Sequence, residues 1–143
     1  MTENTVESIL AEKGEYVATT AGGSMAPLLR DRQYAVRIVP AKGRLKKYDV
    51  ALFRRGEKLV LHRVIKVKKD GYYIRGDHDD EGEYVADGQI VGVLAEVIGR
   101  DKTVKMTDTS YKLYSRLTVL LSPVRRLSRK IRRFIRHRLP KGN

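Results

Sequence analysis

The chain has 143 residues, of which 41% are hydrophobic and 33% charged, so it can form one domain with a modest core and is too apolar for wholesale disorder. It has no cysteine, which excludes disulfides, thiolate metal sites and cysteine nucleophiles. Residues 1–99 carry sixteen basic and fifteen acidic side chains, whereas residues 100–143 carry fourteen and two. We therefore expect a nearly neutral body, residues 1–103, and a basic tail, residues 104–143, that seeks phosphates of lipid or nucleic acid.

The body is predicted to contain one short helix and several strands. Residues 3–13 have the spacing of a short amphipathic helix, which Gly14 would end. EYVATT at 15–20 favours a strand, and a turn with two glycines and a proline follows it. From residue 33, short alternating runs between turn clusters predict an antiparallel, mainly β body; the runs are YAVRIV, DVALF, LVLHRVIKV, YYIRG and IVGVLAEVIG.

The basic tail is predicted to be helical. After Thr107 the apolar spacing changes to 3.6, and Asp108 or Thr109 can begin a helix that ends near Leu121, before the break at Ser122-Pro123. A second helix is expected from about residue 124 to 139, with basic side chains around an apolar stripe and without acidic partners. Such a helix favours an anionic membrane surface, through residues 108–139, or nucleic acid. In the alternative, the stripe packs back on the β body and leaves only the arginines free.

The sequence predicts neither a membrane span nor a secretory signal. No run approaches the roughly 20 apolar residues that a span needs. The N-terminal segment is acidic and lacks a cationic start followed by a hydrophobic run. We therefore expect a cytoplasmic protein that the tail can hold peripherally on the inner face of the membrane.

Three segments carry residues that could take part in catalysis or metal binding. Ser24 lies in the glycine turn and is either a nucleophile or an exposed turn serine. His62, on a predicted strand, is either a general base or a hydrogen-bonded, partly buried histidine. The acidic run at 76–83 could orient a histidine or be a solvated loop, and it lacks the spacing of a calcium loop, so neither a metal nor a cofactor is predicted.

The order of five motifs resembles the type I signal peptidase family, in the branch with a Ser–His pair. The motifs are GGSMAP (22–27), DVALF (49–53), HRVI (62–65), GD (76–77) and GQIVG (88–92), and the likeness covers about residues 15–98. It implies a coiled, barrel-like antiparallel β fold, shared with self-cleaving repressors. Tyr48 departs from the pattern, because the family usually has Gly before Asp49.

The resemblance also implies roles for individual residues. Ser24 matches the nucleophile and His62 the general base. Asp80, in DEGEY at 80–84, matches the third acidic residue, and Asp77 matches the Asp of a Gly-Asp-Asn-Asn motif whose two Asn are here His78 and Asp79. The backbone N–H of Ser24 would meet the oxyanion, and Gly22 offers no side-chain donor where some members have a hydroxyl.

These roles predict a serine endopeptidase of the signal peptidase type that acts on a leader or precursor peptide. The substrate would lie extended beside a strand edge, with small residues before the cut. Met25 and Leu28 would then be pocket neighbours, or else core residues. In the alternative, the chain is a repressor-like or catalytically retired module that binds nucleic acid through the tail. Those repressors, however, use a Ser–Lys pair and a helix-turn-helix, for which the roughly twenty residues before the turn are too few.

Overall fold

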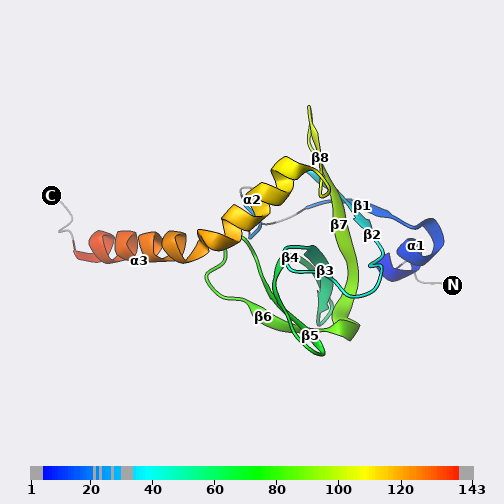
Figure 1. Cartoon of the computed structure of the whole chain (residues 1–143), viewed down its shortest axis with the longest axis horizontal. Coiled ribbons are helices and arrows are strands. Elements are labelled where there is room, and N and C mark those ends of the chain that lie inside the picture. The colour runs from blue at the N-terminus through cyan, green and yellow to red at the C-terminus, as the bar shows by residue number, and fades with distance from the viewer. Residues whose placement is uncertain (1–4, 21, 23, 27, 30–33, 139–143) are drawn as a thin grey trace.

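The protein is a curled antiparallel sheet with one short helix before it and two after it (Figure 1). The computed structural model describes residues 5–20, 22, 24–26, 28–29 and 34–138. Within them, α1 (Val6–Lys13) precedes eight strands, and α2 (Thr109–Leu120) and α3 (Ser122–Arg138) follow. The strands are β1 (Tyr16–Thr19), β2 (Ala35–Val39), β3 (Val50–Arg55), β4 (Lys58–Val67), β5 (Gly71–Arg75), β6 (Glu83–Ala86), β7 (Ile90–Ile98) and β8 (Thr103–Lys105).

The strand order is β1-β2-β7-β3-β4-β5-β6, with β8 beside β7, and all pairs are antiparallel. This half-barrel confirms the predicted mainly β fold. Two strands were not predicted. β8 has three residues, too few to show a period of two, and β6 begins at the end of the acidic run 76–83, which indicated a loop; both strands are defined by their neighbours. Val104 of β8 pairs with Val97, so the sheet continues past residue 103.

The central strand β3 divides the core in two because its alternate side chains point to opposite faces. Val50 and Leu52 join a cluster that also holds Leu10 of α1 and Met25 of the glycine turn. Ala51 and Phe53 join a second cluster with residues of β4, β5 and β6. The turn that carries Ser24 is therefore anchored in the first cluster through Met25, which is 3% exposed.

Helix α1 forms where the sequence predicts it. The Thr5 side chain accepts a hydrogen bond from the N–H of Ser8, and Gly14 ends the helix at a φ of 72°. Glu7 is not a free surface acid, since Arg54 of β3 binds both of its oxygens. The hydrogen bonds from Arg54 lower the pKa of Glu7 to about 2.

Tyr48 has a φ of 81°, in the left-handed region that favours glycine. This explains in physical terms why a glycine suits this position. The strained backbone is held from two sides: Tyr48 N–H donates to Val64 O at 2.9 Å, and Arg63 Nη1 donates to Tyr48 O at 3.0 Å. The ring lies under the cationic groups of Lys47 and Arg116.

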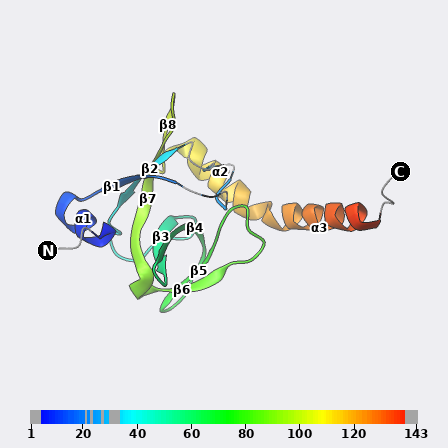
Figure 2. The ribbon, with the colours of Figure 1, turned by 180° about the vertical axis from the view of Figure 1, so that it is seen from behind.

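The two C-terminal helices follow one another with an interruption at Leu121, as predicted from Ser122-Pro123. Asp108 caps α2 by position, although its carboxylate accepts from the N–H of Lys105 rather than from the helix. α2 lies across the β body and α3 extends away from it, as the views from both sides show (Figures 1 and 2). Among the described residues, no helix has the length and apolar character to cross a membrane.

Candidate active site

Ser24 and His62 are in direct contact. The Nε2 atom of His62, on β4, lies 2.8 Å from the Ser24 Oγ atom, across a separation of 38 residues in the chain. His62 pairs with Ala51 of β3, and its ring packs edge-on against Phe53 at a centroid distance of 6.1 Å. A central position in the sheet thus fixes the imidazole, while the hydroxyl comes from the turn after β1.

The surroundings of His62 favour the neutral imidazole. Burial lowers the pKa of His62 below its ordinary 6.5, because the side chain is only 9% exposed. The carboxylate of Asp79 opposes this effect, since its Oδ2 atom lies 3.6 Å from Nε2. A histidine in this state can accept a proton at neutral pH, and a nearby carboxylate stabilises the cation that results.

The loop at 76–79 holds the turn that carries Ser24. The N–H of His78 donates to the Ser24 carbonyl at 2.8 Å, and the N–H of Asp77 points to the Met25 sulfur at 3.4 Å. A Cβ atom on Gly76 would lie 2.7 Å from the Ser24 carbonyl oxygen and 2.4 Å from Asp79 Oδ2. Only glycine at position 76 leaves room for both the Ser24 turn and the Asp79 carboxylate.

A buried ion pair joins the loop at 76–79 to β4. Arg63 binds Asp77 through Nε at 2.7 Å and Nη2 at 2.8 Å, and the two side chains are 0% and 1% exposed. Arg63 Nη1 also donates to Tyr48 O and to the Tyr111 hydroxyl, so α2 is joined to the same network. Burial alone would lower the pKa of Arg63, but the hydrogen bonds and charge of Asp77 outweigh it and raise that pKa.

The structure places the three neighbouring acids in different surroundings. Asp77 and Asp80, the residues expected to orient His62, are both bound by arginines: Asp77 by Arg63, and Asp80 by Arg129 and Arg133 of α3. Asp79, which the motif comparison left without a role, is the acid that lies against His62. It does so on the side of Nε2, the ring atom that Ser24 also contacts.

The Ser24–His62 pair opens onto a cavity of about 580 Å³. Its walls come from β1, β2, β3 and β4 and are largely apolar; they include Tyr16, Ala18, Val36, Ile38, Leu59 and Leu61. Met25 lines the cavity and is buried in the core as well, while Leu28 packs against the core cluster. Thr20 also lines it, and its buried hydroxyl oxygen has no hydrogen-bond partner among the residues the structure describes.

Two parts of this site were not predicted from the sequence: the position of Asp79 against His62 and the ion pair of Arg63 with Asp77. Arg63 follows His62 directly, and strand alternation sends the two side chains to opposite faces. That alternation was a usable signal for a second, different environment beside His62. Ala21, Gly23 and Pro27, which complete the glycine turn, lie outside the described residues.

No protein-family model matches the chain, and no curated protein matches it. The resemblance to signal peptidases therefore rests on the ordered motifs, and the catalytic roles remain predictions that the geometry can support.

Proposed function

We propose that the protein is a serine endopeptidase that cleaves a leader or precursor peptide, with Ser24 as nucleophile and His62 as general base. The observation that carries the proposal is the 2.8 Å contact between Ser24 Oγ and His62 Nε2 at the wall of a cavity. A hydroxyl and a neutral imidazole at this distance form the minimal unit of nucleophilic catalysis.

In the first step, the Ser24 hydroxyl passes its proton to Nε2 as Oγ bonds to the peptide carbonyl carbon. The carbonyl oxygen becomes an oxyanion, for which the resemblance implies the backbone N–H of Ser24 as donor. His62 then gives the proton to the leaving nitrogen as the carbon–nitrogen bond breaks. Water hydrolyses the acyl-enzyme by the same proton route and restores both side chains.

Asp79 would stabilise the imidazolium that exists between these transfers. Its carboxylate lies 3.6 Å from the nitrogen that takes the proton. Burial disfavours the imidazolium, so a fixed negative charge at this distance lowers the energy of the charged intermediate more than it would in water.

The peptide would bind as an additional strand at the edge of the sheet. β1 is an edge strand of the sheet, and its residues Tyr16, Ala18 and Thr19 line the cavity. An extended peptide beside β1 would place alternate side chains into the apolar cavity.

Mass spectrometry of a panel of peptides with small residues before the scissile bond tests the proposal. The wild type should cleave at one bond, and both Ser24→Ala and His62→Ala should lose the activity. Ser115→Ala and His137→Ala are matched controls on α2 and α3 and should cleave like the wild type. Cleavage by Ser24→Ala at the wild-type rate would refute the assignment of the nucleophile.

A further inference from the structure

The two C-terminal helices turn their polar sides to the body and their apolar sides outward. The buried residues of α2 and α3 are Tyr111, Ser115, Thr118 and Ser122. The nine large apolar side chains on the outer side are between 44% and 71% exposed; they are Leu113, Leu117, Leu120, Leu121, Val124, Leu127, Ile131, Phe134 and Ile135. We name these nine the apolar stripe. It does not pack back on the β body, the alternative that the sequence left open.

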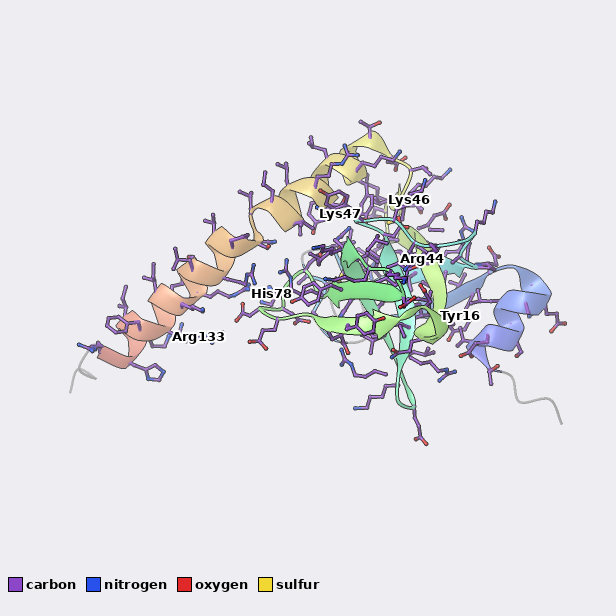
Figure 3. The ribbon with its side chains drawn as sticks, turned by 60° about the horizontal axis from the view of Figure 1, so that its bottom comes forward. Tyr16, Arg44, Lys46, Lys47, His78 and Arg133 are labelled. Carbon is purple, nitrogen blue, oxygen red and sulfur yellow. The ribbon has the colours of Figure 1, made fainter. Side chains whose placement is uncertain are left out.

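Specific contacts fix this orientation. Arg63 binds the Tyr111 hydroxyl at 3.0 Å and Arg75 binds the Ser122 hydroxyl at 2.9 Å. Farther along, Arg126 donates to the Asp80 carbonyl, and Arg129 forms an ion pair with the Asp80 carboxylate. In Figure 3, Arg133 lies on α3 and His78 lies at the edge of the body nearest that helix. The polar side of the helices is therefore occupied, and the apolar stripe faces away.

The charge of this segment has one sign. Residues 109–138 contain ten Lys and Arg and no acidic residue. At 3.6 residues per turn, Arg132 falls along one border of the apolar stripe and Lys130 along the other. Arg138 follows Phe134 by one turn and lies over its ring. All three are exposed. Cations that border an apolar face match the phosphates that border the hydrocarbon of a lipid layer.

We infer that the apolar stripe and its bordering cations form a docking surface for an anionic phospholipid membrane. The helices would lie in the plane of the interface, and the body would stand on their opposite side, above the lipid. This surface is independent of the catalytic assignment and goes beyond the proposed function.

Two other partners fit the surface less well. The stripe has the heptad spacing of a coiled-coil seam from Leu113 to Phe134, but a second copy would bring ten more cations beside these ten. Nucleic acid would match the cations, but it would leave the apolar stripe exposed to water. An anionic membrane covers both features at once.

Flotation of the full-length protein with lipid vesicles tests the inference. The wild type should float with vesicles of phosphatidylcholine and phosphatidylglycerol and remain unbound with phosphatidylcholine alone. Leu127→Gln with Ile131→Gln should weaken binding about a hundredfold, because two buried side chains become polar. The matched control, Val17→Gln with Val67→Gln, replaces two exposed apolar residues outside the stripe and should bind like the wild type.

The charge is tested separately. Lys130→Gln with Arg132→Gln and Arg138→Gln should weaken binding about a hundredfold. The matched triple variant Lys58→Gln, Lys66→Gln and Lys69→Gln removes as many exposed charges from the body and should bind like the wild type. Ser24→Ala should also float like the wild type, so a failed peptidase assignment leaves this result unchanged.

Three outcomes would overturn the inference. The first is equal flotation with neutral and anionic vesicles. The second is that the wild type forms a dimer in analytical ultracentrifugation, Leu127→Gln with Ile131→Gln makes it monomeric, and neither protein binds vesicles. The third is that the wild type binds duplex DNA but not vesicles, and that Leu127→Gln with Ile131→Gln leaves the DNA affinity unchanged.

Discussion

Replacing Gly76 with Ala tests whether the loop at 76–79 sets the geometry of the site. The new methyl carbon would lie 2.7 Å from the Ser24 carbonyl oxygen and 2.4 Å from Asp79 Oδ2. Non-bonded contacts of Cβ below 3.0 Å are essentially never seen, so Ser24 would have to move by about 0.3 Å and the Asp79 carboxylate by about 0.6 Å at least. The Ser24 atom in this contact is the backbone carbonyl oxygen, which side-chain rotation cannot move. It cannot shift alone, because the N–H of His78 is hydrogen-bonded to it.

The expected consequences are a loss of stability and a loss of function together. Overpacking of this kind lowers the free energy of unfolding by about 1–3 kcal/mol, measured by urea denaturation. Displacement of Ser24, the proposed nucleophile, should reduce the cleavage rate by up to about a hundredfold. The shift of Asp79 should also lower the pKa of His62 further, measured by NMR titration, because that carboxylate gives the largest contribution opposing the effect of burial.

Gly88→Ala is the matched control. A Cβ atom there would meet nothing within 4 Å, and the backbone does not need a positive φ. This variant should keep the stability, the His62 pKa and the rate of the wild type. If Gly76→Ala behaved like Gly88→Ala in all three measurements, the loop would not determine the position of Ser24, and the reasoning would be wrong.

Four further predictions follow from single contacts. The cleavage rate should rise with pH through the pKa of His62, below 6.5, and be level at neutral pH; a rise centred well above 6.5 would contradict a buried neutral base. Asp79→Asn should shift this rise to lower pH and reduce the plateau rate, and an unchanged profile would remove the role of that carboxylate. Asp77→Asn should lower the free energy of unfolding by about 3–5 kcal/mol, because it leaves the buried Arg63 unpaired; a loss below 1 kcal/mol would contradict this. Tyr48→Gly should be more stable than Tyr48→Ala by about 1–2 kcal/mol in urea denaturation, since both lose the ring but only Ala keeps the strained φ, and equal stabilities would show that the strain is absent.

The sequence was sufficient for the longer elements because each has its own period. The helix at the N-terminus, six of the strands and both C-terminal helices follow from apolar spacing with a cap or a turn at the ends. The two short strands do not, since β6 and β8 exist through pairing with β5 and β7. Nor could spacing show that the apolar stripe faces water, because spacing identifies a face but not its partner.

The site was predictable to a similar extent. Ser24 and His62 were identified as a pair from the motifs, and the structure brings them together. The acids could not be separated, because Asp77, Asp79 and Asp80 are neighbours in one run of carboxylates. What distinguishes them are cations from distant parts of the chain, Arg63 for the first and α3 for the last.

The ion pairs between α3 and Asp80 mean that the tail is part of the electrostatic environment of the site. Arg129 and Arg133 neutralise a carboxylate adjacent in sequence to Asp79, and their hydrogen bonds and charges lower the pKa of Asp80. A chain cut after residue 121 would lose both cations and leave that negative charge unbalanced. The imidazolium of His62 would then be favoured, so the pKa of His62 would rise and a higher pH would be needed to obtain the neutral base. Truncation would therefore alter the pH response of the body as well as remove the segment that we infer docks on a membrane.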